Sequence, residues 1–143
     1  DAARLQRSFL LNATGPALVA KHFLPTLPRK ERGLFACLSA RVGSISDNEI
    51  GGWYGYRASK AALNMLLKTA AIETARRRAE TVILGLQPGT VDTALSKPFQ
   101  GAVSAESIFS PTESAANLLT VIDGARPQDS GGLYDWRGER IPF

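Results

Sequence analysis

Apolar residues recur at steps of three and four through the first part of the chain, which is the spacing of one face of an α-helix. The stripe consists of Leu5, Phe9, Asn12, Pro16, Val19 and Phe23. It predicts an amphipathic helix over residues 2–27, with the polar side chain of Asn12 on the buried face. Gly15-Pro16 predicts a kink or local break within this helix, and Pro25 and Pro28 predict its end.

Two continuous apolar runs of strand length follow, at residues 34–38 and 81–86. Runs that are apolar at every position are typical of parallel strands covered on both faces. A third, short strand is expected around residues 133–136, after Gly131-Gly132. Ile141 and the residues after it are expected to form a tail.

The longest helical pattern begins at the aromatic cluster of residues 53–56 and runs to about residue 78. Between residues 58 and 72 the pattern is apolar on nearly every side, and a helix of this kind is buried on both sides. One side is expected to pack on the sheet, and a partner subunit is the natural cover for the other. A last helix is expected from the start signal at Ser110-Pro111 to Gly124.

Polar segments follow the two apolar runs. Residues 39–52 are rich in Ser, Gly, Asp and Asn and are expected to form a long loop. Pro88-Gly89 predicts a turn where the second run ends. Ligands of open parallel sheets bind just past the carboxyl ends of the strands, so these two segments are the expected location of a site. Residues 94–110 lack clear periodicity and are expected to form a mobile lid.

Tyr56 and Lys60 are a candidate acid/base pair. Side chains four apart on a helix lie on one face with Cβ atoms roughly 5–6 Å apart, so the phenol and the ammonium can share one small volume. Free tyrosine titrates at about pH 10, and a close positive charge favours the phenolate. We therefore expect the pKa of Tyr56 to be lowered toward neutrality, which suits proton exchange with a substrate oxygen. The alternative is a chance pairing on a helix.

Composition indicates one globular domain over residues 1–143, of which 44% are hydrophobic. The chain has 17 basic and 13 acidic residues, for a net charge of +4, and its only dense basic run is residues 76–78. This run has no interleaved aromatic residues and follows a predicted helix, so we interpret it as helix-terminal cations rather than a nucleic-acid site. The single cysteine, Cys37, excludes an internal disulfide and a cysteine-based zinc site. It is expected to be a buried, inert thiol, and no metal site is expected.

No apolar stretch is long enough to span a bilayer, and no signal-peptide pattern opens the sequence. We therefore expect a cytoplasmic protein. Asp1 is followed at once by a helical pattern, so we expect this chain to be the back part of something longer, or the ordered part of it.

The order of these patterns resembles the C-terminal half of a classical short-chain dehydrogenase/reductase over essentially the whole chain. That order is helix, strand, serine-rich loop, Tyr-x-x-x-Lys helix, strand, Pro-Gly turn, lid, helix and strand. Residues 40–48, 51–54 and the Gly-x-x-x-Asp-Trp-x-Gly tail resemble the branch of C-factor cell-signalling proteins and sniffer-like carbonyl reductases. The resemblance implies an α/β fold, namely the C-terminal part of a Rossmann-like doubly wound parallel sheet with helices on both faces. The N-terminal nucleotide-binding half is absent.

Applied to this sequence, the resemblance implies that Tyr56 is the catalytic acid/base. Lys60 matches the lysine that lowers the tyrosine's pKa and holds the nicotinamide ribose hydroxyls. Asn12 matches the asparagine that holds a water in the proton relay to that lysine. The turn that embraces the nicotinamide carboxamide in the family matches Pro88, Gly89, Val91 and Thr93.

The chain departs from the family at the catalytic serine. The family usually carries Ser-Ser at the end of the strand, and its second serine polarises the substrate oxygen, whereas this chain has Ser39-Ala40. Ser39 and Ser44 are the hydroxyls nearby, and Ser44 is slightly favoured as the replacement because the loop must fold back over Tyr56. The family's Gly-rich phosphate loop has no counterpart, so no residue of this chain is expected to grip a pyrophosphate.

The resemblance implies an oxidoreductase that moves a hydride between NAD(P)(H) and a small carbonyl or alcohol substrate in the full-length protein. NADPH is slightly favoured over NADH. The chain alone is expected to be inactive and to bind no cofactor. A homodimer or homotetramer, formed through the helices that hold Asn12 and Tyr56, is also implied, with no nucleic-acid or membrane partner. The alternative is a catalytically silent scaffold or signalling subunit, to which Ala40 and the missing nucleotide half point.

Overall fold

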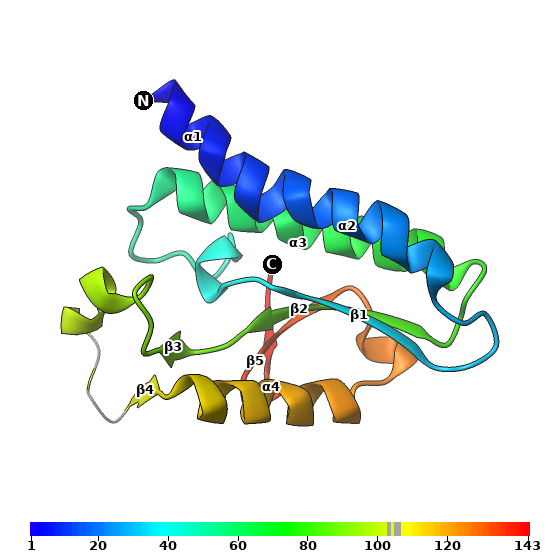
Figure 1. Ribbon diagram of the computed structural model, residues 1–143. Helices are drawn as coiled ribbons and strands as arrows, with labels where there is room; N and C mark the ends of the chain where they lie inside the picture. Colours follow the sequence, from blue (N-terminus) through cyan, green and yellow to red (C-terminus); the bar gives the residue numbers. More distant parts are fainter. Residues whose placement is uncertain (103, 105–106) are drawn as a thin grey trace.

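A four-stranded sheet lies between two layers of helices in the computed structural model, which describes residues 1–102, 104 and 107–143 (Figure 1). The strands of this sheet are β1 (Gly33–Leu38), β2 (Thr81–Gln87), β5 (Gly132–Asp135) and β6 (Arg140–Ile141), in the order β1-β2-β5-β6. β1 pairs with β2 and β2 with β5, both in parallel. The prediction of parallel strands from continuous apolar runs is confirmed.

The sequence pattern does not predict β6, because residues 141–143 are expected to form a tail. Its two residues pair antiparallel with β5, where Leu133 faces Ile141. The turn that joins them places Gly138 at φ +80°, in the left-handed region that glycine adopts without strain. Two residues are too few to show a strand periodicity, so only the pairing with β5 defines this strand.

The first helical segment is continuous but changes its geometry at the centre. It consists of α1 (Ala2–Phe9), a π-helical turn η1 (Leu10–Thr14), α2 (Gly15–Phe23) and a 3-10 turn η2 (Leu24–Thr26). The irregularity expected at Gly15-Pro16 lies one turn earlier, where the amide of Gly15 donates to the Leu10 carbonyl, five residues back. The wider turn lets the chain pass Pro16, which has no amide hydrogen, without ending the helix.

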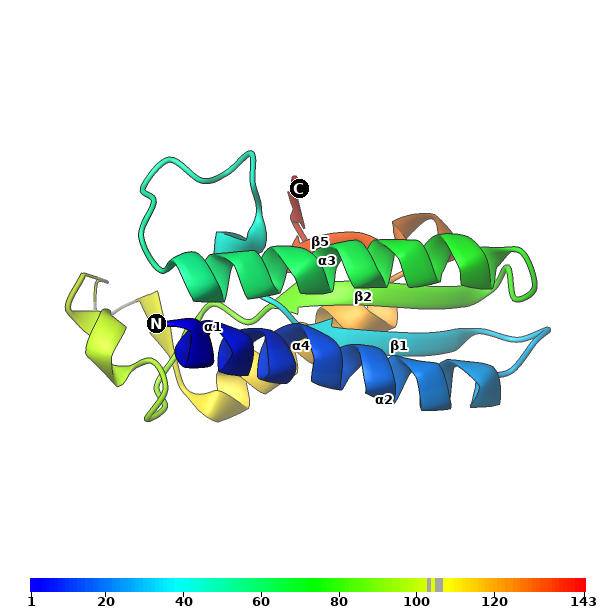
Figure 2. The same ribbon diagram turned by 90° about the horizontal axis from the view of Figure 1, so that it is seen from above.

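The apolar stripe of this segment is less buried than expected. No residue of the stripe is buried: the buried residues of the segment, Ala13 and Ala20, lie off the stripe, and Val19 and Phe23 are 49% and 59% exposed. The reason is the placement of the segment: it runs beside α3 rather than across the sheet (Figure 2). The flank that faces away from α3 therefore has no cover among the described residues.

α3 (Tyr54–Ala75) and α4 (Pro111–Gly124) cover opposite faces of the sheet (Figure 1). Leu63, Leu67 and Ala71 of α3 pack against Ile83 of β2 on one face. On the other face, the side chains of α4 pack against a cluster made of Val82, Leu84, Leu86 and Ala125. Helices on both faces confirm the Rossmann-like α/β expectation.

The remaining elements lie near the carboxyl ends of the strands or in the connections. They are η3 (Arg41–Gly43), β3 (Thr90–Val91), η4 (Lys97–Ala102), β4 (Ile108–Phe109) and η6 (Pro127–Asp129). Part of the expected lid, residues 103, 105 and 106, lies outside the described residues. Among the described helices, none combines the length and the apolar character needed to cross a bilayer.

Candidate active site

The N-terminal half of α3 meets the carboxyl ends of β1 and β2 at one edge of the sheet. The Nζ of Lys60 donates a hydrogen bond to the carbonyl of Leu38, the last residue of β1, at 2.8 Å. The amide of Arg41 donates to the side chain of Gln87, the last residue of β2. The predicted location, past the ends of the parallel strands, is therefore where Lys60 and both loops come together.

Tyr56 and Lys60 lie one helical turn apart on this edge. Lys60 is buried, whereas Tyr56 is 40% exposed and its hydroxyl has no hydrogen bond to another described residue. The Nζ of Lys60 lies 5.9 Å from the centroid of the Tyr56 ring. The pair thus presents a free phenol to solvent beside a cation whose position is set by Leu38.

The expected lowering of the Tyr56 pKa is not found in this arrangement. Burial raises the pKa of Tyr56, because the phenolate would lose solvation. Burial likewise lowers the pKa of Lys60, which the nearby Cys37 thiol partly offsets. The Lys60 ammonium is directed at the Leu38 carbonyl rather than at the phenol oxygen, so it does not compensate the burial. The phenol therefore keeps its proton at neutral pH.

Cys37 is half-buried rather than fully buried. Its pKa is raised by burial, against the opposing charge of Lys60. A raised pKa keeps the thiol protonated, which agrees with the expectation of an inert cysteine.

Asn12 reaches α3 through a serine. Its Nδ2 donates to Ser59 Oγ at 3.1 Å, and Ser59 Oγ in turn donates to the carbonyl of Tyr56 at 2.9 Å. Asn12 lies in the π-helical turn η1, so the turn brings this polar side chain to the helix that carries the candidate pair. No direct bond joins Asn12 to Lys60 in the structure, and its role in a water relay stays a prediction.

Both candidate serines are buried and already have partners. Ser39 Oγ donates to Asn64 Oδ1 at 2.6 Å, and Ser44 Oγ accepts from the amide of Asp47 at 3.1 Å. Ala40, where the family's serine would stand, is also buried. The replacement of the missing serine by one of these two hydroxyls stays a prediction. To bind a substrate oxygen, either hydroxyl would have to break its present hydrogen bond or form a second one.

The loop before α3 is held by Arg57, the neighbour of Tyr56. Its Nε donates to the carbonyls of Gly51 and Gly52 at 3.1 Å, and its Nη1 donates to the carbonyl of Val42. Gly51, Gly52 and Trp53 all have positive φ, and the Arg57 guanidinium lies 5.5 Å from the Trp53 ring centroid. A non-glycine residue at positive φ is strained, so these contacts fix the conformation that starts α3.

The second segment of the predicted site is the turn after β2. Gly89 has φ +78°, and a Cβ there would lie 2.8 Å from the Phe109 ring, so only glycine fits. Ser114 Oγ of α4 donates to the carbonyl of Pro88 at 3.0 Å. Phe109 stacks edge-on against Trp136 with ring centroids 4.6 Å apart. An aromatic pair and α4 thus hold the turn at the edge of the sheet.

The remaining two predicted cofactor residues lie beyond this turn. Val91 belongs to β3, which pairs with β4, and Thr93 is exposed, with its amide bound to Ser96 Oγ. The structure therefore places them in the segment that follows Pro88-Gly89, as their spacing in the sequence requires.

The chemistry of these groups fits one half of a dinucleotide. A free phenol and an ammonium with N–H groups to spare suit the hydroxyls of a ribose and a reacting oxygen. This sequence has no glycine-rich turn that leads from a β-strand into the start of a helix. The residues present therefore do not fit a pyrophosphate. The described part of the chain also contains no group of three or more His, Cys, Asp or Glu side chains that could hold a metal ion.

Asn64 and Arg57 are residues of this edge that the sequence analysis did not assign. Asn64 continues the line of Tyr56 and Lys60 at the next step of four, and that spacing was the signal for it. Arg57 carried no signal, because its partners are backbone carbonyls of a loop whose conformation the sequence does not reveal.

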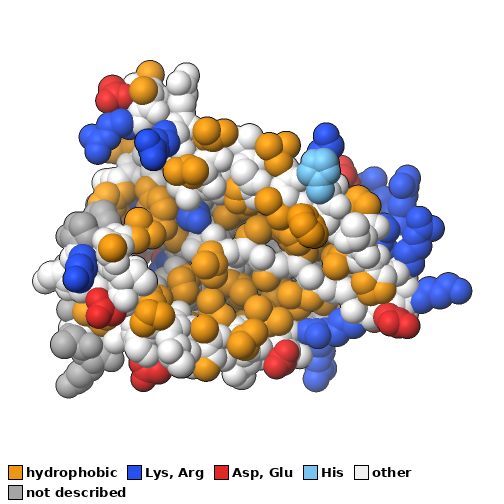
Figure 3. Space-filling model, viewed as in Figure 1, with side chains coloured by type: hydrophobic (Ala, Val, Ile, Leu, Met, Phe, Trp, Pro, Cys, Tyr) orange, Lys and Arg blue, Asp and Glu red, His pale blue; other side chains and the backbone are white. Residues whose placement is uncertain are grey.

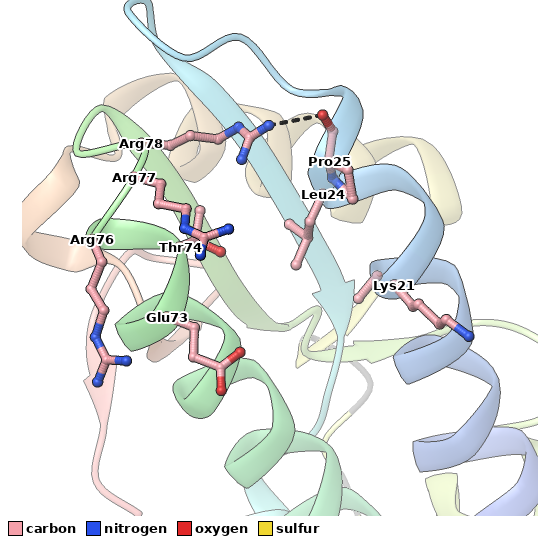
Figure 4. Close-up of a pocket in the computed structure, with 9 residues that line it drawn as sticks. Lys21, Leu24, Pro25, Glu73, Thr74, Arg76, Arg77 and Arg78 are labelled. Atoms are coloured by element: carbon pink, nitrogen blue, oxygen red, sulfur yellow. Dashed lines mark hydrogen bonds between the residues drawn. The ribbon is translucent and has the colours of Figure 1, made fainter.

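A cavity of about 410 Å³ lies at the far end of α3 from Tyr56, between the last turns of α2 and α3 (Figure 4). Its basic residues are Lys21, Arg76, Arg77 and Arg78. α3 ends at Ala75, three residues before the predicted end. Arg78 donates to the carbonyls of Pro25 and Leu27. One member of the basic run thus joins two helix ends, and the cavity is separate from the candidate site.

Comparison with known proteins agrees with the α/β fold described above. The family model for short chain dehydrogenases matches residues 1–103. C-signal of Myxococcus xanthus is 34% identical over 143 residues, which cover 100% of this chain and 81% of that protein. Two solved structures cover 100% of this chain, which spans 58% of each. They are the carbonyl reductase Sniffer of D. melanogaster, at 23% identity and a TM-score of 0.86, and the NADPH-bound carbonyl reductase from chicken fatty liver, at 25% and 0.85. The chain belongs to the short-chain dehydrogenase family.

Proposed function

We propose that the whole protein is an NADPH-dependent carbonyl reductase in which Tyr56 is the acid that protonates the substrate oxygen. The single observation that carries this proposal is the partly exposed Tyr56, whose hydroxyl has no hydrogen-bond partner among the described residues, beside the buried Lys60 at the carboxyl edge of the sheet. The family supports an oxidoreductase, and the NADPH-bound relative supports the cofactor. The cofactor would supply the hydride.

The residues of this chain would orient the reactants and move the proton. Because burial raises the pKa of Tyr56, the phenol holds its proton at neutral pH and can donate it to an oxygen that gains negative charge. Lys60 would hold the ribose hydroxyls with the N–H groups that the Leu38 carbonyl leaves free. The turn from Pro88 through Thr93 would bind the carboxamide. The phosphates would be held by residues outside this chain.

The test is Tyr56→Phe in the full-length protein, with Tyr54→Phe as the matched control. Tyr54 lies two residues earlier on α3 and is 87% exposed. Loss of a positioned acid lowers a rate by about 100-fold or more, so Tyr56→Phe should lose carbonyl reduction to that extent, measured by NADPH oxidation. NADPH affinity should stay within about twofold, and Tyr54→Phe should match the parent protein. Turnover retained by Tyr56→Phe would overturn the assignment.

A second candidate function is a catalytically silent subunit that acts in signalling. It is favoured by Ala40, which stands where the family's serine is expected, and by the relative named C-signal. The two functions differ in turnover. Saturable NADPH binding by the full-length protein, with no oxidation of NADPH across a panel of aldehydes and ketones, would favour the silent subunit. Saturable binding of NADPH by residues 1–143 alone would contradict our proposal that residues outside this chain hold the phosphates of the cofactor.

A further inference from the structure

Three polar residues line one side of α3 at successive steps of four: Tyr56, Lys60 and Asn64. Side chains at this spacing lie above one another on a helix. The first two are the proposed reacting pair. The third lies deeper, where α3 passes the end of β1, and it is only 4% exposed.

Asn64 joins both sides of the turn that follows β1. Its Oδ1 accepts from Ser39 Oγ at 2.6 Å, and its Nδ2 donates to the carbonyl of Gly43 at 3.3 Å. Ser39 lies two residues before the turn η3, and Gly43 is the last residue of that turn. One amide side chain therefore closes this turn onto the helix, with both its acceptor and its donor in use.

Gly43 allows the turn to lie directly on α3. A Cβ at this position would lie 2.8 Å from the backbone carbon of Lys60 and 3.0 Å from Asn64 Nδ2. Real Cβ atoms do not approach backbone this closely, so only glycine brings the chain into the space between Lys60 and Asn64. The turn and the helix are thus in contact at Lys60 itself.

Leu38, whose carbonyl accepts from Lys60 Nζ, immediately precedes Ser39. We propose that Asn64 is a positioning residue, which holds the end of β1 and the turn η3 against α3 and thereby fixes the place of the Lys60 ammonium. The inference rests on the proposed function for its catalytic consequence, but not for the position of Lys60.

An apolar residue would serve the packing of this position as well as asparagine does. Its neighbours on the same side of α3, Leu63 and Leu67, are leucines in the core. A buried amide is tolerated only while it keeps its partners, because an unpaired buried polar group is destabilising. The amide at position 64 therefore binds the loop in one arrangement, which a leucine cannot do.

The experiment compares Asn64→Leu and Gly43→Ala with the parent full-length protein, and uses Met65→Leu as the control. Met65 is the next residue on α3 and is 66% exposed. The direct readout is the pKa of Lys60. It is measured by a pH titration that is monitored by NMR of lysine labelled with ¹³C at the ε position. The groups that face Lys60 are the Cys37 thiol of β1 and the Tyr56 phenol of α3. None of the variants changes either group.

Asn64→Leu and Gly43→Ala should both move the Lys60 pKa up toward its ordinary value, because a loosened turn admits water to the ammonium. Carbonyl reduction should fall about tenfold in kcat, roughly the effect of losing one or two buried hydrogen bonds. KM should stay within about twofold. Met65→Leu should match the parent in both measurements.

The outcomes separate the two proposals. An unchanged Lys60 titration in the folded Asn64→Leu variant would overturn the positioning role, whatever the activity. A parent protein that reduces no carbonyl would overturn the proposed function, and the titration would still decide the role of Asn64. If Asn64→Leu does not fold, Gly43→Ala decides, since it displaces the same turn and leaves the asparagine in place.

Discussion

Asp135 is a buried carboxylate at the end of β5 that organises the turn to β6. Its Oδ1 accepts from the amides of Arg137 and Glu139, at 2.9 and 3.0 Å. Its Oδ2 lies 3.1 Å from Arg137 Nη2 and 3.6 Å from Arg41 Nη2. Burial acts to raise the pKa of Asp135, but the hydrogen bonds from Glu139 and Arg137 and the charge of Arg137 lower it more, so the net direction is down.

This lowered pKa predicts how stability changes with pH. A carboxylate whose pKa is lower in the folded state stabilises above its unfolded pKa, about 3.9, and that contribution is lost as the pH falls through the folded value. Asp135→Asn should therefore lower the free energy of unfolding by about 1–2 kcal/mol at pH 7. The difference should shrink toward zero as the pH falls through the folded pKa, because the carboxyl group is then uncharged like the amide that replaces it.

Urea unfolding of the parent and variant proteins across this range measures the effect. Asp123→Asn is the control, because Asp123 is exposed in the last turn of α4 and its removal should change stability by less than about 0.5 kcal/mol. An Asp135→Asn difference that stays constant with pH would contradict the assignment of this carboxylate.

At the scale of the element, α4 shows how a helix start is encoded locally. Ser110 Oγ accepts from the amide of Glu113, and Glu113 Oε2 accepts from the amide of Ser110 at 2.9 Å. This reciprocal pair is a capping box, and Pro111 at the first position has no amide hydrogen to leave unpaired. α4 begins where the sequence predicted it, because every one of these groups lies within four residues.

Ser110→Ala should destabilise the protein by about 1 kcal/mol, since the amide of Glu113 loses its acceptor. Ser110→Asp should retain most of the stability, because aspartate accepts the same bond and suits the positive end of the helix. Thermal unfolding of the two variants beside the parent checks the order. Equal losses for alanine and aspartate would show that the cap does not stabilise α4.

At the scale of the whole molecule, an apolar surface follows the two helical elements that lie side by side. Its exposed members are Leu10, Leu11, Leu18, Val19, Phe23, Met65, Leu66 and Ile72. In the view of Figure 3, orange side chains lie along the upper part of the molecule, where Figure 1 places α2. Exposed apolar patches of this kind mark interaction sites, and a subunit interface through these helices stays a prediction of the sequence.

We propose that this surface joins two copies of the protein. Light scattering should give the mass of at least a dimer for the parent protein. The double variant Phe23→Glu/Met65→Glu should have the mass of a monomer, because its dimer interface would bury like charges on α2 and α3. Leu119→Glu, at a 58% exposed position on α4, should leave the oligomer unchanged. A parent protein that is monomeric at high concentration would overturn the proposal.

In the candidate site, the features that depend on nearby residues were predictable from the sequence, and those that depend on distant residues were not. The step of four from Tyr56 to Lys60 was enough to place both side chains on one side of a helix. The direction of the Tyr56 pKa was predicted wrongly, because it depends on burial and on the Leu38 carbonyl that takes up the Lys60 ammonium. That carbonyl lies 22 residues away in the sequence, and no pattern along the helix reveals it.

The sequence by itself determined the parts of this protein that depend on neighbours within a few positions: the apolar runs of β1 and β2, the helical pattern of α3 and the start of α4. Only the tertiary structure decided the pairing of β6 with β5, the exposure of Phe23, and the bond of Ser39 with Asn64, 25 residues away. The physical reason is that burial and hydrogen-bond partners belong to the packed chain. Periodicity and capping, by contrast, are already present in each segment.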